Sequence, residues 1–311
     1  MINGVINVYK EKGFTSHDVV AKLRGILRQK KIGHTGTLDP DATGVLPVCL
    51  GNATKLCDMF TEKTKTYKCV LLLGVETDTE DITGEIINKA DDSVIMNLTE
   101  KEVTDVIRSF EGDYEQIPPM YSALKVDGVK LYDLARQGIT IERKSRKVTL
   151  SEIKILSVSL PEVVIEVSCS KGTYIRSLCR DIGEKLGCGG CMKELVRTRS
   201  GHFYIEESLT LGEIEELVQK DEFISKVITT EDALKIYPKI ITKKGSDKLL
   251  HNGNPLSFKD VTEQGEKEDN SVFEGNLDNN IFRTYDSEGT FLGLYKKDEA
   301  KMVYKNEKMF L

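Results

Sequence analysis

The stretch KKIGHTGTLDPDATGVLPVCLG, residues 30–51, is the most informative part of the sequence. It holds four glycines, two prolines, one histidine and two aspartates between a basic run and an apolar segment. It neither alternates like a strand nor repeats like a helix. Pro40 restricts the preceding Asp39 to extended backbone, and the glycines allow the backbone of another molecule to approach closely. We therefore predict a stiff loop that presents the carboxylate of Asp39, with Asp41 as a turn residue.

Regular elements are predicted on both sides of this loop. Thr15 and Asp18 form a capping box before an apolar stripe, and Thr99 and Glu102 form a second one. Alternating apolar residues over 163–169 are typical of a half-buried strand. The predicted helices span 15–27, 99–110, 171–187 and 226–236, and the other predicted strand spans 67–74. This pattern indicates the α+β class, with a mixed, mostly antiparallel sheet flanked by helices.

Length and composition indicate a soluble protein of two domains. The chain has 311 residues, of which 39% are hydrophobic and 30% charged, and this length suits two domains. We expect a large domain over 1–236 and a small β-rich domain over 237–311, with an acidic insert at 258–280. No apolar run approaches the ~18 residues that a membrane helix needs. Because we also expect no signal peptide, and the seven dispersed cysteines suggest reduced thiols, we expect a cytoplasmic protein.

The charges are distributed unevenly although the net charge is −6. Basic residues exceed acidic ones by eight to five over 1–60, by seven to three over 120–150 and by seven to three over 168–200. The balance reverses over 206–280, with nine basic and seventeen acidic residues. Three basic blocks can fold into one basic face, which is the electrostatic footprint of a nucleic acid. A solvated surface of mixed charge is the alternative.

Other chemistries have weaker support in the sequence. Asp39 and Asp41 invite comparison with a glycosidase, but the paired carboxylates of glycosidases usually come from different segments. The CGGC motif at 188–191, with Cys179 and His202, matches no common zinc-finger spacing. The chain has no Walker loop, no GxGxxG and no HExxH motif. We therefore expect neither a metal ion nor a cofactor.

A longer pattern is more specific than any of these motifs. GHTGTLDPDATGVLPVCLGNATKL resembles the signature of the TruB-type family of bacterial tRNA pseudouridine-55 synthases. Further segments resemble that family in the same order along the chain: KTYKCVLLLGVETDTEDITGE, IPPMYSALKVDGVKLYDLARQG, SKGTYIRSLCRDIGEKLGCGG and NGNP. The resemblance implies a pseudouridine-synthase fold with its cleft across the sheet, an insertion at about 117–148 that grips the tRNA T loop, a C-terminal PUA-like RNA-binding domain and a monomer.

The resemblance also implies roles for eight residues. In this family one uridine of the T loop becomes pseudouridine: the C1′–N1 bond breaks, the uracil turns, and C5 bonds to C1′. Asp39 matches the nucleophilic aspartate, Tyr67 the tyrosine that stacks on the target base, and Arg176 the arginine that pairs with the catalytic carboxylate. The substrate-binding positions are matched by His34, Tyr174, Leu195, Lys10 and Asp81.

The chemistry of these residue types agrees with the implied roles. A base inside a folded loop must be flipped out, and stacking on an aromatic ring such as Tyr67 repays about 1–3 kcal/mol of that cost. A nucleophilic carboxylate must be ionised at pH 7, which an arginine partner favours. Whether Asp39 attacks C1′, attacks C6 or promotes a glycal stays open at this point.

One position departs from the family pattern, and two other functions compete. Family members commonly have proline after the lysine that matches Lys10, whereas this chain has Glu11. The first competing function is a synthase that depends on a guide RNA, and the second is an RNA chaperone that folds tRNA by binding alone. We expect a stand-alone enzyme because the 120–150 block resembles the T-loop-gripping insertion and because Asp39, Tyr67 and Arg176 are all present.

Overall fold

A computed structural model describes residues 1–61, 64–126, 128–264 and 278–310. Most of the acidic insert expected at 258–280 therefore lies outside the described residues. Within the part of the chain that is described, no helix is long and apolar enough to cross a membrane.

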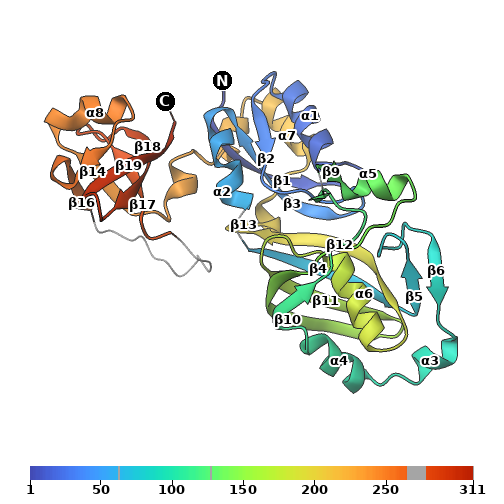
Figure 1. The fold of residues 1–311 in the computed structure, drawn as a ribbon. Coiled ribbons are helices and arrows are strands. Elements are labelled where there is room, and N and C mark those ends of the chain that lie inside the picture. The colour runs from blue at the N-terminus through green and yellow to red at the C-terminus, as the bar shows by residue number, and fades with distance from the viewer. Residues whose placement is uncertain (62–63, 127, 265–277, 311) are drawn as a thin grey trace.

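The larger part of the molecule is built on a nine-stranded sheet (Figure 1). Its main path runs in the order β1 (Gly4–Lys10), β3 (Thr43–Leu50), β12 (Gly190–Ser200), β4 (Lys65–Leu73), β11 (Glu162–Cys169), β10 (Arg146–Ser159) and β7 (Gly112–Gln116), with β2 (Ile32–His34) paired to β3 and β13 (Phe203–Tyr204) to β12. β3 and β12 pair in parallel, and the neighbouring pairs are antiparallel. The predicted mixed, mostly antiparallel sheet is therefore confirmed.

Helices and two short hairpins surround this sheet. They are α1 (Ser16–Ile26), α2 (Cys57–Thr61), α3 (Asp92–Met96), α4 (Glu100–Arg108), α5 (Leu131–Arg136), α6 (Ile175–Lys185) and α7 (Leu211–Gln219), with the hairpins β5 (Val75–Thr77)–β6 (Ile86–Lys89) and β8 (Lys125–Val126)–β9 (Val129–Lys130). Both predicted capping boxes are present, at Thr15 and Thr99. α6 is followed by Gly187, whose φ of +73° suits glycine. Local sequence signals therefore set where these helices begin and end.

The C-terminal region forms a separate six-stranded sheet. Its order is β15 (Leu256–Ser257), β19 (Val303–Met309), β18 (Phe291–Asp298), β17 (Ile281–Tyr285), β14 (Lys239–Thr242) and β16 (Val261–Gln264), with α8 (Asp247–His251) beside it. An apolar cluster joins the two sheets, because Leu294 and Phe310 pack together with Val45 and Leu56. The Asn52 side chain also donates a 2.6 Å hydrogen bond to the Phe310 carbonyl. The C-terminal sheet is therefore packed against the larger part.

The helix predicted over 226–236 is wrong. Only a 3-10 turn at Asp232–Leu234 forms there, and a second 3-10 helix precedes it at Phe223–Lys226. Ile228 instead pairs with Val5 of β1 through two backbone hydrogen bonds of 2.8 and 2.9 Å. The apolar residues of this segment thus serve an extended pairing rather than a helix face. The remaining 3-10 helices are Gly51–Leu56, Ile205–Glu207, Lys244–Ser246 and Phe258–Asp260.

The packing of α6 against the start of β12 makes a testable prediction. A Cβ added at Gly183 would lie 2.2 Å from the Gly190 nitrogen and from the Gly189 carbonyl carbon, so backbone would have to move. We expect Gly183→Ala to lower the free energy of unfolding by about 2–3 kcal/mol in urea denaturation. Gly212→Ala is the control, because α7 has open space there, and it should be neutral or stabilising. Equal stability of the Gly183 variant and wild type would contradict this packing.

Candidate active site

Asp39 lies on the loop between β2 and β3, and neighbouring groups fix that loop. The Leu38 amide donates to the Ser16 hydroxyl at 2.9 Å, and the Ala42 amide donates to the Asp39 carbonyl at 3.1 Å. The Asp39 side chain nevertheless keeps 42% of its surface exposed. The loop therefore holds its backbone rigidly while the carboxylate stays accessible.

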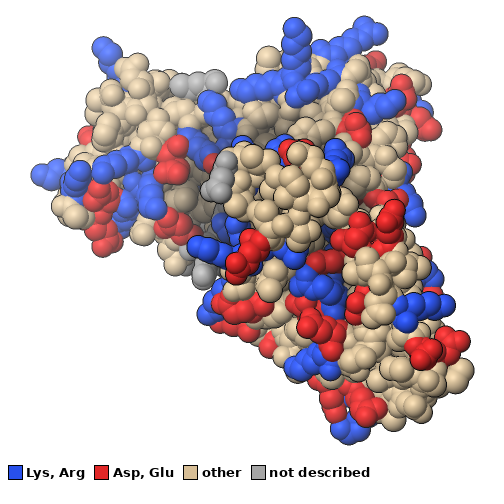
Figure 2. Space-filling view, turned by 45° about the vertical axis from the view of Figure 1, so that its right-hand side comes forward, with Lys and Arg blue, Asp and Glu red and all other residues tan. Residues whose placement is uncertain are grey.

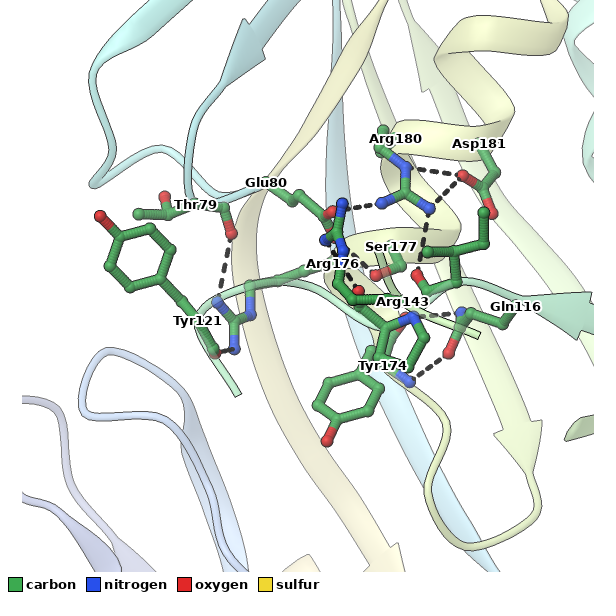
Figure 3. A network of polar contacts seen from close by, with 12 residues as sticks. Thr79, Glu80, Gln116, Tyr121, Arg143, Tyr174, Arg176, Ser177, Arg180 and Asp181 are labelled. Carbon is green, nitrogen blue, oxygen red and sulfur yellow. Dashed lines mark hydrogen bonds and ion pairs between the residues drawn. The ribbon is translucent and has the colours of Figure 1, made fainter. Parts of the chain in front are cut away.

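The carboxylate of Asp39 is paired with a guanidinium from the first turn of α6. Arg176 Nε lies 3.1 Å from Asp39 Oδ2, and the Arg176 side chain is only 7% exposed. Its other nitrogens contact Asp81 Oδ2 at 3.6 Å and donate to the carbonyls of Thr79 at 3.2 Å and Tyr121 at 2.9 Å (Figure 3). With partners on every side, Arg176 has one orientation, and it directs one edge at Asp39.

A second layer of polar contacts braces α6 from behind (Figure 3). Arg180 pairs with Glu80 and donates through Nε to Asp181 at 2.7 Å. Ser177 donates to Glu80 at 2.5 Å. Burial raises the pKa of Glu80, while Arg180 and Ser177 oppose that rise. These contacts tie α6 to the turn after β5, which is the same turn that carries Asp81.

Asp39 and Arg176 border two adjoining cavities. The first, of about 500 Å³, is also lined by Tyr67, Tyr174 and Leu195. The second, of about 620 Å³, shares Asp39, Arg176 and Leu195. Volumes of this size suit a small ligand or a single flipped nucleotide. Another cavity of about 970 Å³ between α1 and α7 lies away from Asp39.

Two tyrosines of the first cavity, Tyr67 and Tyr174, are held by their surroundings. Burial raises the pKa of Tyr67, so its phenol is neutral at pH 7. Gln116 fixes the backbone of Tyr174 from both sides, accepting from its amide at 2.8 Å and donating to its carbonyl at 2.9 Å. Both rings therefore line the cavity from fixed backbone positions.

The structure thus brings six of the eight sequence-predicted residues together. They are Asp39, Tyr67, Asp81, Tyr174, Arg176 and Leu195, and each lines one of the two cavities. His34 is not among the lining residues: it lies half-buried on β2, with its ring 5.0 Å from that of His17. Burial lowers the pKa of His34. Their roles in a reaction stay predictions at this point.

Lys10 differs from its expected place on an RNA-facing surface. It ends β1 fully buried, and its ammonium donates to three carbonyls, of Glu11 at 3.1 Å, Phe14 at 2.6 Å and Pro40 at 2.9 Å. Burial lowers the pKa of Lys10 to about 8, against the pull of nearby carboxylates. The physical reason for the difference is that this cation serves the loop around Pro40 and has no surface left for RNA.

Sequence reasoning missed further cavity-lining residues. They are Lys65, Tyr121, Ser122, Tyr132 and Arg197. Arg197 is two positions from Leu195 on one strand, so alternation along β12 could have placed both on the same face. Each of the three basic blocks contributes a cation to the cavity walls, namely Lys12, Arg136 and Arg176.

The cysteines that invited a zinc reading lie in the protein interior. Cys179 and Cys69 face each other at 3.5 Å, and Cys188 and Cys191 are buried. Among the residues that the structure describes, no three His, Cys, Asp or Glu side chains are grouped to hold a metal ion.

Comparison with known proteins identifies the family. A family model described as "TruB family pseudouridylate synthase (N terminal domain)" matches residues 24–175, and one described as "tRNA pseudouridylate synthase B C-terminal domain" matches 176–234. The tRNA pseudouridine synthase B of Lachnoclostridium phytofermentans is 56% identical over the full length of both chains. The chain belongs to the TruB family of pseudouridylate synthases. A second relative, tRNA pseudouridine synthase B of Clostridium perfringens, is 45% identical over 100% of this chain and 99% of its own.

Solved structures agree with this assignment. A Cbf5–Nop10–Gar1 complex contains a chain with a TM-score of 0.73 and 28% identity, covering 99% of this chain and 85% of that one. An H/ACA RNP bound to a substrate RNA containing 2′-deoxyuridine gives 0.71 and 26%, with the same coverage. The expected pseudouridine-synthase fold is confirmed, and the C-terminal sheet is consistent with a PUA-like domain.

The buried ammonium of Lys10 makes a prediction about stability. Lys10→Met would remove the ammonium from three partly buried carbonyls, of which the Pro40 carbonyl keeps the Gly13 amide as a donor. Each buried carbonyl that is left without a donor costs about 1–3 kcal/mol. We expect a decrease of roughly 3 kcal/mol in the free energy of unfolding, measured by urea denaturation. The neighbouring Lys12→Met is the control: this side chain is 73% exposed and only 3.8 Å from Asp41, so its change should stay within about 0.5 kcal/mol. Similar losses of unfolding free energy in both variants would rule out a special stabilising role for the Lys10 ammonium.

Proposed function

We propose that the protein converts uridine 55 in the T loop of tRNA to pseudouridine, alone and without a guide RNA. The observation that carries this proposal is the Asp39–Arg176 ion pair beside a cavity lined by Tyr67. In the reaction the C1′–N1 bond breaks, C5 bonds to C1′, the C5 proton leaves, and N1 takes up a proton. No atoms are gained or lost, so the isomerisation needs no oxidant and no phosphate donor.

The geometry supports a role for each of the three residues. Asp39 is exposed enough to reach a flipped nucleotide, and Arg176 pairs with its carboxylate and aims it. Tyr67 offers a neutral aromatic ring on which the uracil can stack. Leu195 and Tyr174 complete the apolar wall. This arrangement supports attack by the carboxylate on the sugar or on the base, and it is compatible with glycal formation.

An exposed basic surface on α1 and its exit supports binding of a phosphate backbone. Its members are Lys22, Arg24, Arg28, Lys30 and Lys31, all exposed. None of them forms an ion pair with another described residue. In Figure 2 basic side chains project from the end of the molecule where Figure 1 places α1. Phosphate contacts from such a surface would orient the tRNA while the cavity receives the base.

The proposed function also assigns roles to the insertion at 117–148 and to the two domains. The β8–β9 hairpin and α5 lie within the proposed T-loop-gripping insertion at 117–148, and Tyr132 and Arg136 extend from α5 to the cavities. We take 1–236 as the catalytic domain and 237–311 as an RNA-binding domain. A cytoplasmic monomer suits an enzyme that meets free tRNA.

Two competing functions remain to be separated by experiment. The two solved structures described above are complexes with further proteins or RNA, which would suit a guide-dependent synthase. The curated relatives that match over the full chain are named for tRNA, which favours the stand-alone enzyme. A chaperone acting by binding alone would have no need of the Asp39–Arg176 pair.

One assay separates these functions. Purified protein is incubated with an unmodified tRNA transcript, without metal ion or guide RNA, and pseudouridine is mapped by carbodiimide treatment and primer extension. The proposal predicts a single stop at the T-loop uridine. The guide-dependent alternative predicts no product until a guide is added, and the chaperone predicts none under any condition.

The role of Asp39 predicts a difference between the two aspartates of the loop. Asp39→Asn should abolish turnover and leave the tRNA dissociation constant within about threefold, because phosphate contacts lie elsewhere. Asp41→Asn is the matched control, since Asp41 is 53% exposed and only 3.8 Å from Lys12, and it should keep at least a third of wild-type kcat. If Asp39→Asn lost binding and turnover together, Asp39 would be structural.

The basic surface on α1 predicts how binding depends on salt. Replacing Lys22 and Lys30 by glutamine should weaken tRNA binding and reduce the slope of log K against log salt by about 1–2, with kcat unchanged. A control with equal charge change, Lys101→Gln with Arg108→Gln, lies on α4 at the other end of the larger part (Figure 1). Equal effects of the two double variants would contradict a binding surface on α1.

A further inference from the structure

Arg197 is a buried cation that the proposed reaction has not yet used. It lies on β12, is 1% exposed, and is the largest of the fully buried side chains among the described residues. Within the described part of the chain, no carboxylate lies in ion-pair distance of its guanidinium. A buried charge without a counter-ion is costly unless its donors are satisfied. The identity of those acceptors therefore indicates what Arg197 does.

The acceptors belong to the loop that carries Asp39. Arg197 Nε donates to the Val45 carbonyl at 2.6 Å, Nη2 to the Gly36 carbonyl at 3.3 Å, and Nη1 lies 3.5 Å from the Thr37 carbonyl. Gly36 and Thr37 come before Asp39 in the chain, and Val45 comes after it. One planar guanidinium thus joins the outgoing and the returning arm of the loop.

The backbone of β12 also supports the returning arm of the loop, which contains Val45. Arg197 pairs with Gly44 in the parallel junction of β12 and β3. Gly44 has φ of +102°, and a Cβ there would lie 2.2 Å from the Arg197 carbonyl oxygen. The returning arm is therefore seated directly on β12, and the side chain of Arg197 extends that contact to the outgoing arm.

We propose that Arg197 is the positioning residue that fixes the Asp39 loop against the central sheet. This inference rests on the proposed function. Because Arg197 also pairs with Tyr67 across β12 and β4, the strand that bears the stacking ring and the loop that bears the carboxylate contact the same residue. Arg176 aims the carboxylate itself, whereas Arg197 holds the backbone from which that carboxylate extends.

A lysine at this position separates positioning from charge. A lysine ammonium keeps the positive charge but cannot present a planar fork to three carbonyls on two arms. Arg197→Lys should therefore lower the single-turnover rate about 100-fold, nearly as far as Arg197→Met, because a misplacement of about 1 Å costs that much. The tRNA dissociation constant should stay within about threefold.

Arg199→Met is the matched control. Arg199 lies on the same strand, donates to the Gly201 carbonyl at 2.8 Å, and contacts the Tyr204 ring. We expect its single-turnover rate to stay within about threefold of wild type. The thermal midpoints of all three variants show whether folded protein is being compared.

Hydrogen exchange supplies a readout that needs no tRNA. The Leu38 amide donates to the Ser16 hydroxyl of α1, and the Ala42 amide donates to the Asp39 carbonyl within the loop. Arg197→Lys should therefore speed the exchange of both amides at least about tenfold, with the core amides of β4 unchanged. Arg199→Met should leave the exchange rates of these two amides unchanged. A wild-type rate and wild-type exchange in Arg197→Lys would overturn the proposal, as would unfolding of both Arg197 variants, which would make Arg197 part of the general core. Faster exchange in Arg197→Lys, combined with a wild-type protein that makes no pseudouridine, would overturn the proposed function alone.

Discussion

The ion pair between Asp39 and Arg176 is the interaction on which the rest of the site depends. A carboxylate on an exposed loop would turn freely in water, whereas this one meets a guanidinium whose other nitrogens are all occupied. The surrounding structure makes that meeting possible. Contacts of Arg180 and Ser177 with Glu80 brace α6, and Lys10 and Arg197 hold the loop backbone. Two rigid segments that are distant in sequence therefore place the Asp39 carboxylate and the Arg176 guanidinium 3.1 Å apart.

Much of the fold could be predicted because its signals are local. A capping box needs two residues three positions apart, so Thr15 with Asp18 set the start of α1 reliably. Alternation likewise identified β11. The helix predicted over 226–236 failed because Ile228 pairs with Val5, more than two hundred residues away. Periodicity within a segment carries no information about such a partner.

The site could be predicted only as far as a long motif reached. The motif supplied Asp39, the later segment SKGTYIRSLCRDIGEKLGCGG supplied Arg176, and the structure places the two residues in contact. The motif did not predict that Lys10 is fully buried or that Arg197 bridges two arms of the loop. The sequence alone does not show whether a cationic side chain contacts a phosphate or a backbone carbonyl. Only tertiary packing decides between those partners, and here it assigned two cations to the loop.

We propose that Arg176 serves the chemical step by orienting Asp39. This proposal is tested most directly by the single-turnover release of tritium from tRNA transcribed with [5-³H]uridine, since bonding of C5 to C1′ expels that hydrogen. Wild type should release one equivalent per tRNA. Arg176→Lys keeps the charge but loses the fixed fork, so its rate should fall at least about 100-fold while tRNA binding is retained. A wild-type rate of tritium release in Arg176→Lys would contradict the account.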